Sequence, residues 1–274
     1  MKKIFTVIFV IGILFCAMRM VDAMEPKENK PAETLCIAHR GGAAYAPENT
    51  LAALNNAIKI GADYSEVDVH LSSDGHVVVI HDDLLERTTD GEGLVKDMTL
   101  ARLKELDAGS WFSEEFKGEK IPTLEEVLDT AKGKIGVVIE IKNGPYFYEG
   151  IEQKVIDLVE EKNMEKDVII ISFDHECIKT VNSIAPFIAT GVLYYANILD
   201  VEELKEDTGA EYICPGWALA TQKALKDCHE EKIKMNIWTV NDEKVMKKFI
   251  DLKVDAITTD KPDVLLKALG RECK

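Results

Sequence analysis

Basic residues are scarce in this chain relative to acidic ones. Its 274 residues include 33 Lys and Arg but 49 Asp and Glu, which gives a formal net charge of -16 at pH 7. Nucleic-acid binding requires a basic face that neutralises phosphates, so this balance argues against a nucleic-acid partner. It also disfavours binding to anionic membrane surfaces. The composition is otherwise that of an ordinary globular protein, long enough for one large α/β domain or two small ones.

The sequence also lacks a cysteine framework. One of the six cysteines, Cys16, lies in an N-terminal apolar segment. The other five are widely spaced, at Cys36, Cys177, Cys214, Cys228 and Cys273. An odd and scattered set predicts no disulfide scaffold. Because there is no CxxC pair and no Cys/His cluster, a zinc site is not indicated either.

The N-terminal apolar run is too short for a membrane span. Met1-Lys2-Lys3 precedes the 15-residue run Ile4–Met18, and Val21-Asp22-Ala23 follows with the pattern of a cleavage site. A spanning helix needs about 20 apolar residues. Residues 1–23 are therefore predicted to be a secretory signal peptide. The protein is expected to be secreted or extracytoplasmic, at the cell surface or in the periplasm, with no stable membrane span after cleavage. An uncleaved anchor and lipidation at Cys16 are alternatives.

A polar, proline-containing segment follows the leader. "EPKENKPAE" at residues 25–33 predicts a flexible linker over residues 24–34. The folded domain is expected to span residues 35–270.

Within that domain, short β-rich runs alternate with amphipathic helical stretches. The predicted strands are Leu35–His39, Tyr64–Val69, Gly136–Ile141, Val168–Ser172, Ala189–Leu193, Tyr212–Cys214, Met235–Val240 and Ala256–Thr259. The predicted helices are Thr50–Ile60, Leu124–Lys132, Ile151–Lys162, Cys177–Ile184, Val201–Asp207, Gln222–Glu230, Glu243–Leu252 and Pro262–Leu269. Asn49 is expected to cap the first helix, and Thr123 with Glu126 forms a capping-box pattern. Such alternation predicts a parallel sheet closed into a (β/α)8 TIM barrel, with an open doubly wound sheet as the alternative.

One segment interrupts the alternation. "EVDVHLSSDGHVVVIHDD" contains two β runs joined by a turn with Asp74-Gly75. Such a short turn can close a hairpin but cannot make a parallel crossover. The second run should therefore be antiparallel to the first, and residues 71–120 are predicted to be a small insertion between the second strand and its helix.

Charged side chains lie at the predicted strand ends, where barrel enzymes place their active sites. His39 and Arg40 end the first strand, Glu66 and Asp68 share one face of the second, and Glu140 and Lys142 share one face of the third. His81 returns on the hairpin to the level of Asp68. Buried carboxylates are costly unless they are neutralised. Three carboxylates without a thiol suit one divalent cation, Ca²⁺ or Mg²⁺.

Each of these signals is weak alone. A Glu-x-Asp pair in a strand is usually a solvated face, and a histidine at a strand end is usually a surface residue. Arg40 could simply pair with an acid, and Trp238 is by default a core residue. Their coincidence at corresponding strand ends favours a functional site.

The motifs "HRGGAAYAPENT", "EVDVHLSSDGHVVVIHDDLLERTTDG", "IPTLEEVL", "IEIK" and "WTVN" occur in this order along the chain. In this combination the sequence resembles the glycerophosphodiester phosphodiesterase family, from about Leu35 to Leu269. The resemblance implies a TIM barrel with an insertion after the second strand. It also implies hydrolysis of small-molecule glycerophosphodiesters, such as glycerophosphocholine, to sn-glycerol 3-phosphate and an alcohol.

The resemblance also implies residue roles. Carried over by motif, it makes Glu66, Asp68 and Glu140 the metal ligands. It makes His39 and His81 the acid–base pair. Arg40 and Lys142 become phosphate contacts, Phe173 and Trp238 substrate-binding residues of the pocket, and Glu48 and Asn49 supporting residues.

Two other functions are compatible with parts of the pattern. A barrel phospholipase of the C or D type, acting on intact or lyso-lipids, would need an apolar rim. The clusters Trp111, Phe112 and Phe116, or Tyr146, Phe147 and Tyr148, are candidates for such a rim. A non-catalytic binding protein with the same barrel is the other alternative, which the full set of charged residues disfavours. The oligomeric state is left open by the sequence.

Overall fold

The computed structural model describes residues 33–196, 198 and 200–273, and a single compact unit begins at Thr34. The predicted signal peptide over residues 1–23 lies outside the described residues, as does the predicted linker apart from its last two positions. Among the described helices, none combines the length and apolar character needed to cross a bilayer.

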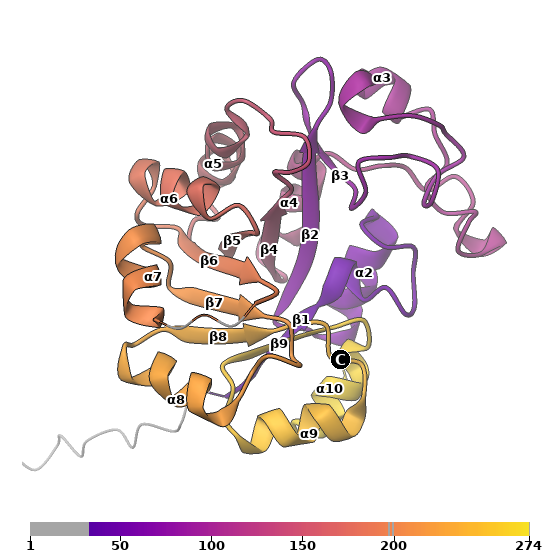
Figure 1. Cartoon of the computed structure of the whole chain (residues 1–274). Helices are drawn as coiled ribbons and strands as arrows, with labels where there is room; N and C mark the ends of the chain where they lie inside the picture. The colour runs from indigo at the N-terminus through magenta and orange to yellow at the C-terminus, as the bar shows by residue number, and fades with distance from the viewer. Residues whose placement is uncertain (1–32, 197, 199, 274) are drawn as a thin grey trace, which may run out of the picture. The chain divides into compact units, whose positions relative to one another are not determined.

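Eight parallel strands form a closed barrel, which confirms the predicted (β/α)8 fold (Figure 1). They are β1 (Leu35–Ala38), β2 (Tyr64–Leu71), β4 (Gly136–Ile141), β5 (Val168–Ser172), β6 (Ala189–Tyr194), β7 (Tyr212–Pro215), β8 (Lys234–Ile237) and β9 (Ala256–Thr259). Strand β1 closes the barrel because it pairs with β2 through Ile37–Tyr64 and with β9 through Leu35–Ala256. The open-sheet alternative is therefore wrong.

Helices alternate with these strands and surround them in Figure 1. They are α2 (Leu51–Ile60), α4 (Leu124–Ala131), α5 (Ile151–Glu161), α6 (His175–Ile184), α7 (Val201–Thr208), α8 (Gln222–Glu230), α9 (Glu243–Asp251) and α10 (Pro262–Ala268). The capping box of Thr123 and Glu126 is present at α4, and Pro262 occupies the first turn of α10, both as predicted.

The predicted hairpin is confirmed. Strand β3 (Val77–Val79) runs antiparallel to β2 with Val69 opposite Val79. The backbone amide of Ile80 donates to the carbonyl of Asp68 at 3.0 Å, which brings the next residue, His81, beside the inner residues of β2. The chain then passes through α3 (Leu100–Leu103) and two 3-10 turns, Val95–Asp97 and Glu114–Phe116, before α4. A small core of its own, with Val78, Leu85 and Leu103 buried, stabilises this segment.

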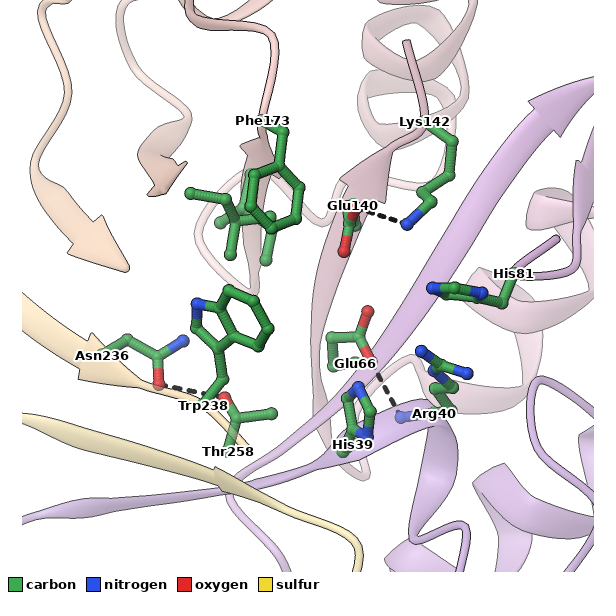
Figure 2. Close-up of a pocket in the computed structure, with 12 residues that line it drawn as sticks. His39, Arg40, Glu66, His81, Glu140, Lys142, Phe173, Asn236, Trp238 and Thr258 are labelled. Carbon is green, nitrogen blue, oxygen red and sulfur yellow. Dashed lines mark hydrogen bonds and ion pairs between the residues drawn. The ribbon is translucent and has the colours of Figure 1, made fainter. Parts of the chain in front are cut away.

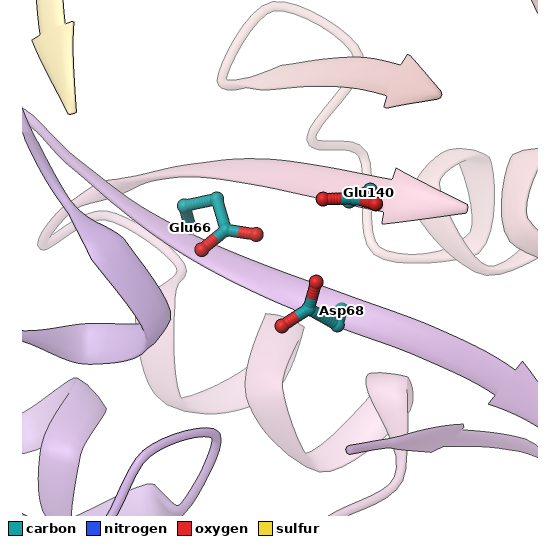
Figure 3. Close-up of side chains that lie close together, drawn as sticks. All are labelled: Glu66, Asp68 and Glu140. Atoms are coloured by element: carbon teal, nitrogen blue, oxygen red, sulfur yellow. The ribbon is translucent and has the colours of Figure 1, made fainter. Parts of the chain in front are cut away.

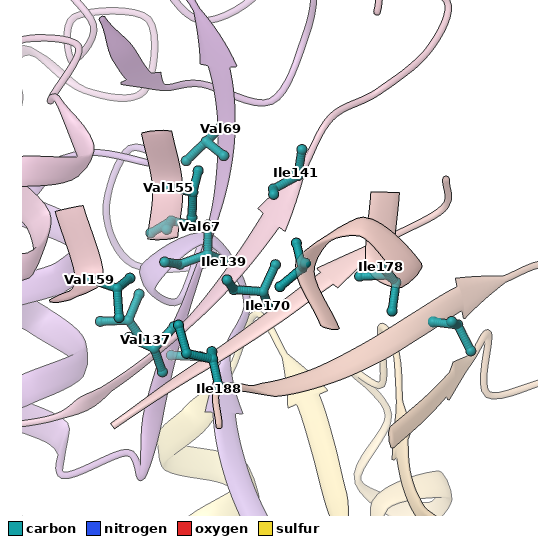
Figure 4. Packing of buried hydrophobic residues seen from close by; sticks show 14 of the residues in the cluster. Val67, Val69, Val137, Ile139, Ile141, Val155, Val159, Ile170, Ile178 and Ile188 are labelled. Atoms are coloured by element: carbon teal, nitrogen blue, oxygen red, sulfur yellow. The ribbon is translucent and has the colours of Figure 1, made fainter. Parts of the chain in front are cut away.

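The main core lies between the strands and the helices. The side chains of a strand alternate between its two faces. Val67 and Val69 of β2 and Ile139 and Ile141 of β4 therefore pack outward against the helices (Figure 4), where Val155 of α5 covers them. Burying each such side chain stabilises the fold by about 1.5–3 kcal/mol. The intervening residues of β2 and β4 must then point into the barrel.

Three sequence predictions differ from the structure near the strand ends. Strand β1 ends at Ala38, and His39 begins a 3-10 turn, His39–Gly41. The cap of α2 is Thr50, whose side chain accepts from the amide of Ala53, so the predicted Asn49 cap is wrong. Strand β8 ends at Ile237, so Trp238 follows the strand instead of lying within it.

Candidate active site

Three carboxylates converge inside the barrel at the carboxyl ends of neighbouring strands. Glu66 and Asp68 come from β2, and Glu140 of β4 lies directly across the ladder from Asp68. All three side chains are buried, and one carboxylate oxygen of each lies within 4.8 Å of the others (Figure 3). An all-oxygen donor set of this size fits a hard divalent cation.

The pKa values of the three carboxylates are also consistent with a bound divalent cation. Burial, together with the charges of Asp68 and Glu140, raises the pKa of Glu66 well above its usual range. Burial and the charge of Asp68 raise the pKa of Glu140 to about 7. Burial would also raise the pKa of Asp68, but Lys142 and Arg40 lower it to about 2. The protein's own cations therefore do not fully compensate the cluster, and an added cation would favour its ionised form.

Arg40 reaches this cluster from a sharply bent turn. Its φ of 50° lies in the left-handed region, and Gly41 follows with φ of 84°. A Cβ at Gly41 would lie 2.6 Å from the Cβ of Ala53, so only glycine lets the turn pack on α2. The amide of Arg40 donates to Glu66 at 2.8 Å, and its guanidinium Nη1 donates to Glu48 at 2.7 Å.

The Nε of Arg40 is buried and has no hydrogen-bond partner, with the nearest Asp68 oxygen at 3.5 Å. Burial alone would lower the pKa of Arg40, but Asp68, Glu48 and Glu66 raise it, so the side chain stays charged. Arg40 therefore places a permanent positive charge in the wall of the pocket.

Asn49 holds a metal-ligand candidate instead of capping a helix. Its side-chain Nδ2 donates to Asp68 at 2.8 Å, and its Oδ1 accepts from the Asp68 amide at 3.2 Å. This requires a φ of 60° at Asn49, which asparagine tolerates better than most residues. The two contacts fix the direction of the Asp68 carboxylate.

Lys142 lies just beyond the end of β4. Its ammonium is 2.7 Å from Glu140 and 3.6 Å from Asp68. Burial would lower its pKa, but these carboxylates raise it. Arg40 and Lys142 therefore add two permanent positive charges to the pocket.

His39 is oriented by a carboxylate from the opposite end of the chain. Its Nδ1 lies 2.6 Å from Asp260, whose other oxygen accepts from Asn241 at 2.5 Å. Burial would raise the pKa of Asp260, but hydrogen bonding to His39 lowers it, so the carboxylate stays ionised. An ionised carboxylate can only accept, so Nδ1 carries the proton and Nε2 is left for the pocket.

His81 has an equivalent partner. Its Nδ1 lies 2.6 Å from Asp82, and Arg87 donates to the other oxygen of Asp82 at 2.6 Å. The hydrogen bond from Arg87 lowers the pKa of Asp82, which again fixes the imidazole with Nδ1 protonated. Burial lowers the pKa of His81, so its neutral form is favoured near pH 7.

The buried side chain of His70 contacts the backbone of His81. Nε2 of His70 lies 3.1 Å from the carbonyl oxygen of His81, and Nδ1 lies 3.0 Å from the hydroxyl of Tyr148. The rings of His70 and Tyr148 meet edge to face. Tyr148 is buried here, so of the expected apolar rim after Lys142 only Phe147 is strongly exposed.

Eight of the predicted residues, together with other side chains, line one pocket that is open to solvent, and the space within it and at its mouth amounts to about 430 Å³ (Figure 2). Two aromatic side chains, Phe173 and Trp238, lie on the side opposite the charged residues. Their ring centroids are 5.5 Å apart at nearly a right angle, and the indole N–H donates to the carbonyl of Cys214 at 2.7 Å. The pocket thus has a charged wall and an aromatic wall.

The structure brings all the predicted site residues to one end of the barrel. His39, Arg40, Glu66, His81, Glu140, Lys142, Phe173 and Trp238 line the pocket directly. The other three lie outside this lining: Asp68 contacts Lys142, Glu48 contacts Arg40, and Asn49 contacts Asp68.

The residues that orient this set were not predicted in that role: Asp82, Arg87, Tyr148, Asn241 and Asp260. Asp82 and Arg87 lie within the motif "EVDVHLSSDGHVVVIHDDLLERTTDG", close to His81 in sequence. This proximity could have indicated that they orient the imidazole. Asp260 follows the last strand directly, which by the carboxyl-end rule also marks it as a candidate.

Comparison with known proteins agrees with this geometry. The sequence model of the glycerophosphoryl diester phosphodiesterase family matches residues 39–264. A glycerophosphodiester phosphodiesterase of Caldanaerobacter subterraneus subsp. tengcongensis is 43% identical over 235 residues, covering 85% of this chain and 97% of that protein. One from Bacillus subtilis is 37% identical over 257 residues, covering 86% and 87% of the two chains.

Solved structures are similar as well. A phosphodiesterase of Oleispira antarctica, determined with the product sn-glycerol-3-phosphate, is 33% identical with a TM-score of 0.78, covering 85% of this chain and 96% of that one. A glycerophosphodiester phosphodiesterase of Agrobacterium tumefaciens is 32% identical with a TM-score of 0.74, covering 85% and 99%.

Proposed function

Since the chain belongs to the glycerophosphoryl diester phosphodiesterase family, a family of hydrolases, we propose that it cleaves small glycerophosphodiesters such as glycerophosphocholine. The products would be sn-glycerol 3-phosphate and an alcohol. The observation that carries the proposal is the pairing of two oriented imidazoles, His39 and His81, beside two cations in one pocket. The product bound to the Oleispira antarctica relative supports the same reaction.

The residues of this chain suit a phosphodiester. Arg40 and Lys142 would hold its charged oxygens, and Arg40 can do so with two donors. More negative charge develops on those oxygens in the transition state, so preorganised cations lower the barrier. One neutral imidazole would take a proton through Nε2 from the attacking hydroxyl, while the other, in its imidazolium form, would donate its Nε2 proton to the leaving oxygen.

Glu66, Asp68 and Glu140 would hold one divalent cation, Ca²⁺ or Mg²⁺. Their oxygen chemistry, proximity and raised pKa values at Glu66 and Glu140 support this assignment. When bound, the cation would supply further positive charge for the phosphoryl oxygens.

A product assay with purified protein tests the proposal. Glycerophosphocholine, a lysophospholipid and an intact phospholipid are incubated with Ca²⁺, with Mg²⁺ and with chelator, and glycerol 3-phosphate is measured together with the released headgroup alcohol and headgroup phosphate. Release from the deacylated diester, dependent on metal, is the expected result. Cleavage of only the acylated substrates would instead support a phospholipase. Transient cyclic glycerophosphate would identify the glycerol hydroxyl as the nucleophile, and its absence would favour water.

We also propose that the enzyme acts outside the cytoplasm. The basic start, the apolar run and the small residues before Met24 support export. Cell fractionation and N-terminal sequencing of the exported protein test this, with a mature chain starting at Met24 as the expected result. Recovery of the full-length chain only in the cytoplasm would contradict it.

A further inference from the structure

The aromatic wall continues outward from the pocket. Phe173 is 46% exposed and Tyr195 is 72% exposed, although both are large apolar rings. The ring centroids of Tyr195 and Trp238 are 6.0 Å apart and tilted by 54°, while Phe173 meets Trp238 almost perpendicularly. We call these three side chains, Phe173, Tyr195 and Trp238, the aromatic rim. Phe173 and Trp238 line the pocket and Tyr195 does not, so the rim leads from the pocket toward solvent.

Two of the three rings have contacts that limit their movement. The indole of Trp238 is anchored by its hydrogen bond to Cys214. The Tyr195 ring lies against Gly216, where an added Cβ would come within 2.8 Å of it. Because Gly216 has no side chain, the Tyr195 ring can pack directly against its backbone. Exposed aromatic faces that are fixed in this way are typical of a binding surface.

The position of the aromatic rim relative to the charged wall indicates which part of the substrate would contact it. Arg40 and Lys142 lie on the charged wall, across the pocket from Phe173 and Trp238 in Figure 2. A diester phosphate held by these cations carries two substituents. The glycerol hydroxyls fit the polar, carboxylate-lined interior, so the leaving alcohol is the part that extends along the rim.

The electrostatics of the rim favour a cationic leaving alcohol. Aromatic faces attract cations through the ring quadrupole, and the chain as a whole carries a formal charge of -16. Among the described residues that line the pocket, the carboxylates are Glu66 and Glu140, both members of the buried triad. The rim thus offers π faces but no carboxylate of its own. A primary ammonium needs hydrogen-bond acceptors to replace its water, whereas a quaternary ammonium needs none.

We propose that the aromatic rim is a leaving-group subsite that selects a quaternary ammonium alcohol, and that Tyr195 is its outer, specificity-determining residue. This inference rests on the proposed diesterase function and specifies its substrate class. It predicts preference for choline over ethanolamine and over neutral alcohols of the same shape.

The test compares glycerophosphocholine with its neutral isostere, glycerophospho-3,3-dimethylbutanol, in which carbon replaces the quaternary nitrogen. The metal-loaded wild-type enzyme should show a kcat/KM about 5- to 30-fold higher for the choline diester. Glycerophosphoethanolamine should be cleaved less efficiently than glycerophosphocholine. Since all three substrates yield glycerol 3-phosphate, one assay measures the whole series.

Variants then locate the effect. Tyr195→Leu keeps apolar bulk but removes the π face, so the preference for choline over the isostere should fall about 2- to 5-fold. Tyr195→Phe keeps the ring and should keep the preference. Phe187→Ala removes an exposed ring that does not line the pocket, and it should keep the wild-type preference.

Each outcome is decisive. Equal kcat/KM for the two diesters, or an unchanged preference in Tyr195→Leu, would overturn the subsite while leaving the diesterase function established. A preference for the neutral isostere would show an apolar subsite and would also overturn it. If no diester releases glycerol 3-phosphate, both proposals fall.

Discussion

The imidazole Nε2 of His70 lies 3.1 Å from the backbone carbonyl oxygen of His81. Because a carbonyl only accepts, Nε2 carries a proton, and Nδ1 must then accept from the hydroxyl of Tyr148 at 3.0 Å. His70, which is fully buried in β2, therefore fixes the backbone of His81, which lines the pocket.

This relationship predicts that His70 positions His81. His70→Leu should lower kcat by about 10- to 100-fold with little change in KM, since a small misplacement of a reacting group is costly. His70→Gln, which can keep a donor near the carbonyl, should recover part of the loss. Steady-state kinetics separate the two parameters. An equal loss in both variants, with KM raised, would point to a general folding defect.

Removal of either pocket imidazole should nearly abolish turnover. For His39→Ala and His81→Ala we expect losses of about 10²–10⁴-fold in kcat, the usual scale of acid–base catalysis. His76→Ala, at an exposed position beside the hairpin turn, serves as the matched control and should behave as wild type. Circular dichroism and thermal unfolding should show that all three variants are folded. Wild-type activity in either catalytic variant would disprove the two-histidine mechanism.

Asp260 should act only through His39. Asp260→Asn would disturb the tautomer of the imidazole, and kcat should drop at least about 10-fold. In a His39→Ala background, the same substitution should have almost no further effect, because the residue it orients is gone. A double-mutant cycle of kcat values measures this coupling. Additive losses would assign Asp260 a separate role.

Divalent cations should stabilise the protein. Ligand binding to the folded state adds about 2.7 kcal/mol at a concentration 100-fold above Kd. Thermal unfolding of chelator-treated protein should therefore shift upward with Ca²⁺ or Mg²⁺. Glu66→Gln should lose the shift yet remain folded, because the raised pKa of Glu66 already disfavours its charge. Glu161→Gln, an exposed residue of α5, is the control. No shift in wild type with either ion would contradict a metal site.

Glu48 should stabilise the fold in a pH-dependent way. Burial would raise its pKa, but Arg87 and Arg40 lower it below the ordinary 4.5. A carboxylate with a depressed folded pKa stabilises fully above its unfolded pKa, and this stability is lost as pH falls through the folded pKa. Glu48→Gln should therefore cost roughly 1.5–3 kcal/mol of unfolding free energy near neutral pH. The difference from wild type should shrink below about pH 4.5.

Urea unfolding of wild type and Glu48→Gln at several pH values checks the sign. Glu161→Gln again provides a control in which no such difference is expected. If the difference in unfolding free energy between wild type and Glu48→Gln grew toward acid pH, Glu48 would not be ionised in the folded protein.

The barrel could be predicted from sequence because its determinants are local. Strand and helix periods alternate along the chain, and the short Asp74-Gly75 turn permits only an antiparallel hairpin. The two-residue period predicts that Glu66 and Asp68 share one face of β2, and the structure shows that this face points into the barrel.

The rest depends on contacts distant in sequence. Asn49 and Thr50 are both good helix caps, and the structure selects Thr50 because Asn49 is needed by Asp68. His39 and Asp260 are 221 positions apart, and no local pattern pairs them. The partner of His70 in β2 is likewise distant, because Tyr148 comes from the loop between β4 and α5.

The insertion after β2 also contributes directly to the end of the barrel that holds the pocket. Arg87 donates to Glu48 through its two terminal guanidinium nitrogens, Nη1 at 3.0 Å and Nη2 at 2.7 Å, and Glu48 also accepts from Arg40. The insertion and the turn His39–Gly41, which carries Arg40, are thus tied by one shared carboxylate. A chimera that exchanges this insertion between homologous enzymes should therefore also carry Glu48, which lies outside the insertion. If Asp82 and Arg87 came from one enzyme and Glu48 from another, the hydrogen bonds that join the insertion to the turn could be lost.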